Sequence, residues 1–119
     1  MAGRQERVAL AIRKEIANLV LLRMRDPRLS QVTITGAEVS RDWSVARVFV
    51  SALGDEQRLR DAVEALNEAA GYVRRQIAPN LTLRQIPELH FEPDDTARRA
   101  QRLEQIFRDH EAEEGGHAG

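Results

Sequence analysis

The sequence predicts an α+β fold in which helices pack on one face of a small three-stranded sheet. Three observations support this: a first segment with helical apolar spacing, two adjacent segments rich in β-branched residues, and a second helical stretch followed by one more strand. The predicted order is helix, strand, strand, helix, kink, helix, strand. The chain has 119 residues, of which 42% are hydrophobic, so it can bury one ordinary core.

The first helix is predicted over residues 4–24 by a stripe of apolar residues at spacings of three and four. It should end before Pro27, because the proline ring disfavours the α conformation at Asp26. The polar side is basic and carries Arg4, Arg7, Arg13, Lys14, Arg23, Arg25 and, just past the helix end, Arg28. A solvated helix face is the commoner explanation. An RNA-facing surface requires other basic groups to converge on it.

Residues 32–39, "VTITGAEV", and residues 45–50, "VARVFV", alternate and are rich in β-branched side chains, which predicts a β-hairpin. Gly36 shifts the parity of the apolar positions, as a β-bulge does. Trp43 lies in or beside the turn. It could stack on a base, but we expect it to pack over the edge of the core.

Helical spacing resumes at Leu59 and continues to Pro79, across Ala69, Ala70 and Gly71. These small residues predict a kink at which two helices approach closely, with Gly71 at positive φ if the kink requires it. The stretch "LTLRQIPELHFE", residues 81–92, is predicted as the third strand, with Pro87 marking a bulge or an edge.

The net charge of −1 conceals an uneven distribution. Residues 1–84 hold 14 Lys and Arg against 10 Asp and Glu, or +4, whereas residues 85–119 hold 4 against 9, or −5. A basic body that could meet phosphate therefore precedes an acidic end. We expect residues 1–93 to form the domain. Residues 94–119 should form a terminal helix and an acidic, flexible tail whose removal after Arg108 leaves thermal stability unchanged.

Several classes of function are disfavoured. The chain has no Cys, its three His lack metal-ligand spacing, and no catalytic set is apparent, so we expect no enzyme, no cofactor and no metal. No segment resembles a signal peptide or a membrane span, so we expect a cytoplasmic protein without a membrane partner or small-molecule substrate.

Taken in order, the segments resemble the bacterial ribosome-binding factor A family. The resemblance rests on "RVALAIRKEIANLV", "DPRLSQVTIT", "EVSRDWSVARVFVS", "AAGYVRRQIA" and "LRQIPELHFEPDDT", which together span about residues 4–107. It implies a K-homology type II-like fold. It also implies a monomeric, non-enzymatic factor that binds the immature small (30S) ribosomal subunit and assists late 16S rRNA maturation, including 5′-end processing and growth in the cold.

K-homology domains contact nucleic-acid backbone through a Gly-x-x-Gly loop between two helices. In this family Ala-x-Gly replaces it, here Ala69-Ala70-Gly71, and the first turn of the following helix would include Arg74 and Arg75. Backbone N–H groups at that helix start would favour a phosphate, although the segment could serve packing alone. The predicted RNA contacts are Arg4, Arg7, Lys14, Arg25, Arg28, Ala69, Ala70, Gly71, Arg74, Arg75 and Arg84. The alternative is a protein-interaction module whose basic face binds an acidic protein.

Overall fold

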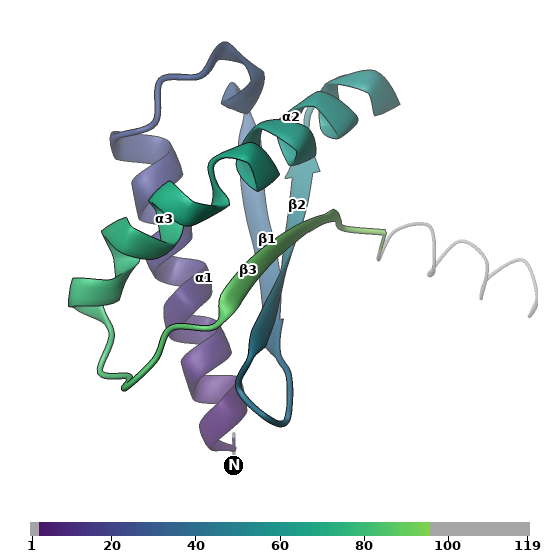
Figure 1. Cartoon of the computed structure of the whole chain (residues 1–119). Helices are drawn as coiled ribbons and strands as arrows, with labels where there is room; N and C mark the ends of the chain where they lie inside the picture. The colour runs from purple at the N-terminus through teal and green to yellow at the C-terminus, as the bar shows by residue number, and fades with distance from the viewer. Residues whose placement is uncertain (1–2, 96–119) are drawn as a thin grey trace, which may run out of the picture.

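The structure, a computed structural model, describes residues 3–95, so the predicted terminal helix and acidic tail lie outside it. Its elements are α1 (Arg4–Leu22), the 3₁₀ turn η1 (Pro27–Leu29), β1 (Val32–Val39), β2 (Val45–Ala52), α2 (Glu56–Glu68), α3 (Ala70–Ile77), the 3₁₀ turn η2 (Ala78–Asn80) and β3 (Glu88–Pro93). The predicted order of elements is confirmed (Figure 1). None of the helices in residues 3–95 is both long and apolar enough to cross a membrane.

The sheet has the order β1-β2-β3, so β2 is central. β1 pairs antiparallel with β2, and β3 pairs parallel with β2. The pairing skips a residue between Ile34 and Gly36, which confirms the predicted bulge. Parallel neighbours require a long crossover connection. Here α2 and α3 form that crossover and lie beside the sheet (Figure 1).

One face of the sheet forms the core. Along β2, Ala46, Val48 and Val50 are buried while Arg47 between them is exposed, as the two-residue period of a strand requires. α1 packs against β1, α2 against β2 and β3, and α3 against β3. The residues buried in this shared cluster include Ile12, Ile16, Leu66, Val73, Ile77, Leu89 and Phe91. The prediction of helices on one face of a three-stranded sheet is thus confirmed.

The third strand is shorter than predicted and begins at Glu88. Pro87 does not interrupt it, because the first ladder pair joins Val45 to Glu88. The preceding loop is held by side-chain contacts instead of strand pairing. Arg74 donates from Nε to the carbonyl of Ile86 at 3.0 Å, and Ile86 is buried. This hydrogen bond from Arg74 anchors the loop that precedes β3 to α3.

The kink between α2 and α3 is confirmed, but the role expected of Gly71 is wrong. The break lies at Ala69, the single residue between the two helices, with φ −92° and ψ 6°. Gly71 is the second residue of α3 and is exposed. Among the described glycines, only Gly54 has a positive φ, 113°. A Cβ on Gly71 would meet only Arg75 Nη1, at an ordinary 3.5 Å, so glycine is required there neither for close helix packing nor for backbone conformation.

Candidate nucleic-acid interface

The structure distributes the predicted RNA contacts over three regions. The α1 face consists of Arg7 and Lys14. The helix junction consists of residues 68–75 together with Arg28 of η1. The hairpin-end site combines Arg4 at the start of α1, Trp43 in the hairpin turn and Arg84 in the loop before β3. Arg25 follows α1 and is described separately.

The α1 face presents two free cations. Arg7 and Lys14 are exposed and lie seven residues apart, which is about two helical turns or ~10.5 Å along the axis. At about 100° per residue, their side chains lie within about 20° of each other around the helix. Within residues 3–95 neither forms an ion pair or a side-chain hydrogen bond. Both charges are therefore available to an external anion.

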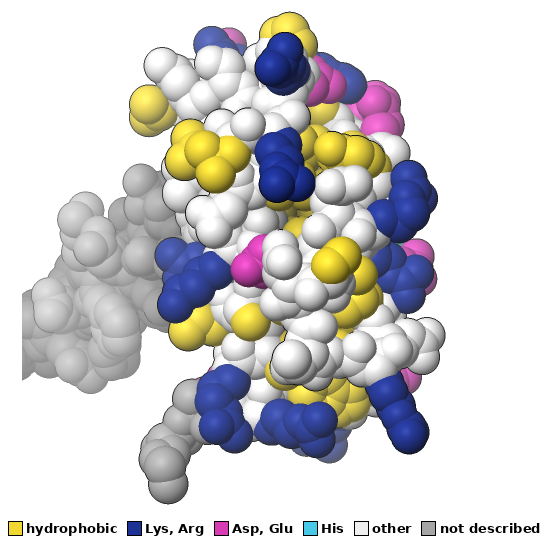
Figure 2. All heavy atoms as spheres, turned by 90° about the vertical axis from the view of Figure 1, so that its left-hand side faces the viewer, with side chains coloured by type: hydrophobic (Ala, Val, Ile, Leu, Met, Phe, Trp, Pro, Cys, Tyr) yellow, Lys and Arg dark blue, Asp and Glu magenta, His cyan; other side chains and the backbone are white. Residues whose placement is uncertain are grey.

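Arg25 lines a groove between α1 and β1, with a volume of about 910 Å³. Lys14 lines the same groove, so this hollow connects the α1 face with the segment after the helix. Arg13 also reaches it, but its Nε donates to the carbonyl of Ile34 at 3.4 Å. Figure 2 shows one face of the molecule, on which Lys and Arg side chains gather at the lower end, the end at which α1 begins in Figure 1.

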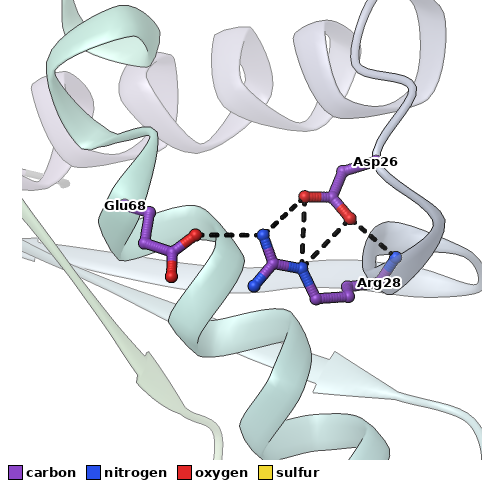
Figure 3. Close-up of polar contacts among 3 residues, drawn as sticks. All are labelled: Asp26, Arg28 and Glu68. Atoms are coloured by element: carbon purple, nitrogen blue, oxygen red, sulfur yellow. Dashed lines mark hydrogen bonds and ion pairs between the residues drawn. The ribbon is translucent and has the colours of Figure 1, made fainter.

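At the helix junction, Arg28 is held by two carboxylates. Its Nη2 lies 2.8 Å from Asp26 Oδ2 and 3.0 Å from Glu68 Oε2, which ties η1 to the last residue of α2 (Figure 3). The hydrogen bonds from Arg28 lower the pKa of Asp26 below its ordinary value. Two negative charges thus offset this cation beside the start of α3. That Arg28 contacts RNA stays a prediction, and its charge is not free.

Arg74 and Arg75 differ in their availability. Both lie in the second turn of α3, because the helix begins at Ala70 and not at a later residue; the predicted first-turn position is wrong. Arg74 is half-buried and its guanidinium donates through two nitrogens to the Ile86 carbonyl, so it anchors the loop. Arg75 is exposed and has no such partner in residues 3–95. With only Ala69 between the helices, the junction contains no open loop.

The hairpin-end site brings together residues that are distant in the sequence. The Arg4 guanidinium lies 5.5 Å from the centroid of the Trp43 ring, within cation–π range. Arg4, Trp43 and Arg84 line one hollow of about 350 Å³. Trp43 is half-buried and belongs neither to the core cluster nor to the residues packed against it. It therefore packs on Arg4 and not, as expected, over the core edge.

The turn that carries Trp43 is built around Asp42. Its Oδ1 accepts hydrogen bonds from Ser44 Oγ at 2.7 Å and Ser40 Oγ at 2.8 Å. The bonds from Ser44 and Ser40 lower the pKa of Asp42 to about 2. Trp43 itself has φ 65°, a left-handed conformation that bulky residues rarely adopt. The serine and aspartate contacts hold the turn in this conformation.

Sequence reasoning named Arg4 and Arg84 as contacts but did not place Trp43 with them. Trp43 lies about 40 positions from Arg4 and from Arg84 in the sequence. No local sequence pattern predicts a contact between residues that far apart. It also omitted Arg41, an exposed cation beside the same turn. Residues 3–95 hold no cluster of three or more His, Cys, Asp or Glu that could bind a metal ion.

Comparison with known proteins gives consistent matches. The family model described as ribosome-binding factor A matches residues 4–107. A ribosome-binding factor A from Thioalkalivibrio sulfidiphilus is 42% identical over 105 residues, covering 88% of this chain and 81% of that protein. The solution structure of a Thermotoga maritima putative ribosome-binding factor A has a TM-score of 0.69 at 38% identity, covering 77% and 88% of the two chains. A homology model of the Thermus thermophilus ribosome-binding factor A, fitted into the cryo-EM map of a 30S complex with that factor, has a TM-score of 0.63 at 27% identity, covering 76% of this chain and 94% of that chain.

Proposed function

The chain belongs to the ribosome-binding factor A family, and from this premise we propose that it binds the immature small ribosomal subunit and assists its late maturation. In this proposal the protein acts as a monomer without catalysis. It contacts 16S rRNA, supports processing of the RNA 5′ end, and is needed most for growth in the cold. The relative described in a 30S complex supports the choice of subunit.

The main support for an RNA contact is that some cations are free, whereas others are already paired within the protein. Arg28 and Arg74 are engaged within the protein, whereas Arg7 and Lys14 project from α1 without partners in residues 3–95. Phosphate contacts supply much of the affinity of proteins for nucleic acid, and they require cations that are free to exchange counterions. The α1 face and the hairpin-end site meet that requirement better than the helix junction does.

Sedimentation of the full chain with purified subunits tests the proposal. The protein should migrate with 30S subunits and not with 50S subunits. Arg7→Glu with Lys14→Glu should weaken this binding at least tenfold without changing the melting temperature, because exposed charges contribute little to stability. The matched control is Arg58→Glu with Arg60→Glu, which makes the same charge change on α2, where both residues are exposed.

Two results would contradict the proposal. Equal weakening by the α1 pair and the α2 pair would mean that only total charge matters. In a parallel sedimentation of cell extract, migration with a soluble acidic protein instead of the subunit would favour the protein-interaction alternative. In cells, loss of the protein should cause accumulation of small-subunit RNA with an unprocessed 5′ end and slow growth in the cold. Normal processing without the protein would limit its role to binding.

A further inference from the structure

Trp43, in the hairpin turn, has a strained backbone conformation. In a tight turn, a position with left-handed backbone is ordinarily occupied by Gly or Asn. A residue with a bulky side chain at such a position is an outlier. Trp43 adopts φ 65° and leaves its indole outside the core. Its amide donates to the Ser40 carbonyl at 3.0 Å, which fixes the backbone of the turn. Strain of this kind persists where the surroundings over-determine it, and it concentrates at binding sites.

The groups around the indole suit a planar ligand that carries negative charge. Arg4 lies over the ring at 5.5 Å, and Arg84 lines the same hollow without a partner among the described residues. Among the described residues that line the hollow, the one carboxylate is Asp42, which already accepts hydrogen bonds from both serines of the turn. At about 350 Å³ the hollow lies at the small end of the range for small-molecule sites.

The start of β3 is fixed against the same turn. The amide of Glu88 donates to the carbonyl of Ser44 at 2.9 Å, so the loop that carries Arg84 ends at a fixed point beside the hairpin. Gln5 of α1 donates to the carbonyl of Ser40 at 2.8 Å, which holds the helix start on the other side. The three segments that supply Arg4, Trp43 and Arg84 are therefore anchored to one another before any ligand arrives.

We propose that Arg4, Trp43 and Arg84 form a site for one unpaired nucleotide, whose base stacks on the indole while the two guanidinium groups contact the adjoining phosphates. A base in a duplex has both faces covered by its neighbours, whereas an unpaired base exposes its face to aromatic and Arg side chains. This inference rests on the proposed function and adds to it the kind of RNA recognised at the hairpin end.

Trp43 is the only tryptophan in the chain, so its fluorescence reports on this site directly. A single-stranded hexaribonucleotide should quench the emission of the full chain, and a six-base-pair RNA duplex should quench it much less. Trp43→Leu should weaken hexanucleotide binding, measured by anisotropy of a labelled RNA, on the order of 5- to 100-fold, the range for loss of one base stack. Phe49→Leu, which alters another half-buried aromatic residue, on β2 and outside the three regions, is the matched control and should leave affinity unchanged.

Other outcomes overturn the inference without touching the proposed function. Equal quenching by duplex, inorganic phosphate or polyglutamate would show an anion site that does not select unpaired bases. Unchanged affinity of a folded Trp43→Leu variant, or no binding of the hexanucleotide to the wild type, would remove the nucleotide site. Binding of the same proteins to 30S subunits is measured in parallel, and its loss in the wild type would instead overturn the proposed function.

Discussion

The helix junction and the hairpin-end site both contain arginines, but the two regions employ them in opposite ways. At the junction, Arg28 is held by two carboxylates and Arg74 by a loop carbonyl. At the hairpin end, Arg4 and Arg84 surround a hollow, and Arg84 has no partner in residues 3–95. The junction carries the more recognisable sequence motif, whereas the hairpin end has the arrangement of groups that can receive a ligand. A motif between two helices therefore does not by itself identify the binding surface.

The largest expected contrast between the two regions is in stability. Arg74→Ala should lower the free energy of unfolding by about 2 kcal/mol, because it removes a charged donor and leaves the Ile86 carbonyl without its partner. Arg84→Ala should change it by less than about 0.5 kcal/mol, as for ordinary surface positions. Urea unfolding followed by circular dichroism measures both. A similar loss in the two variants would show that Arg84 also supports the fold.

Removing a glycine from the helix junction and introducing one at the hairpin end sharpens the comparison of the two regions. Gly71→Ala should raise stability by up to about 1 kcal/mol, since residue 71 is an exposed helical position with room for a Cβ. Trp43→Gly should leave stability unchanged or raise it by up to about 1 kcal/mol, because it relieves a left-handed backbone at a non-glycine residue. Thermal unfolding of the two variants provides the measurement.

Binding then separates these two variants. Trp43→Gly should weaken 30S binding while Gly71→Ala leaves it intact. If Gly71→Ala lost affinity although fully folded, the backbone of the junction would contact RNA. Ala69-Ala70-Gly71 would then have a binding role in addition to a structural one.

A smaller effect is expected in the salt dependence of RNA binding. Log affinity should fall linearly with log salt, with a slope of about −0.7 per phosphate neutralised on a single strand. Arg84→Gln should therefore reduce the magnitude of the slope by about 0.7. Arg28→Gln should leave the slope unchanged, because Asp26 and Glu68 already neutralise this cation. Equal slopes for both variants would contradict the distinction between free and paired cations.

The smallest predicted effect concerns acid stability at the hairpin turn. The folded protein holds the pKa of Asp42 at about 2, below the ordinary 3.8. The resulting stabilisation is complete above about pH 4 and is lost as the pH falls toward 2. Asp42→Asn should flatten part of this decline in acid unfolding curves. Glu64→Gln, at an exposed position of α2, is the control and should leave the curve unchanged.

Much of the fold could be predicted because its signals are local. The apolar stripe of α1, the alternation of β1 and β2, and the shift at Gly36 each depend on residues a few positions apart. The start of β3 could not be predicted, since Arg74 holds the Ile86 carbonyl from another element. The conformation of Gly71 also escaped prediction. Glycine is compatible with a positive φ but does not impose it, and here the helix begins before that residue.

The candidate site was predictable in composition but not in arrangement. The cations of α1 share a face by helical periodicity alone, so Arg7 and Lys14 follow from the sequence. Whether an arginine is free depends on long-range neighbours, as the contact of Arg28 with Glu68, 40 residues away, illustrates. The same applies to Trp43, which meets Arg4 only once the hairpin folds back on α1.

The mixed sheet also sets an order of folding events. β1 and β2 are joined by a short turn and can pair early, because closing a short loop loses little chain entropy. β3 must pair with β2 across the whole of α2 and α3, a non-local contact of the kind that slows folding. Until that step, Val48 and Val50 of the central strand lack their neighbour on one side. Completion of the sheet and assembly of the hairpin-end site are consequently one event, because Arg84 reaches Trp43 only when β3 has docked.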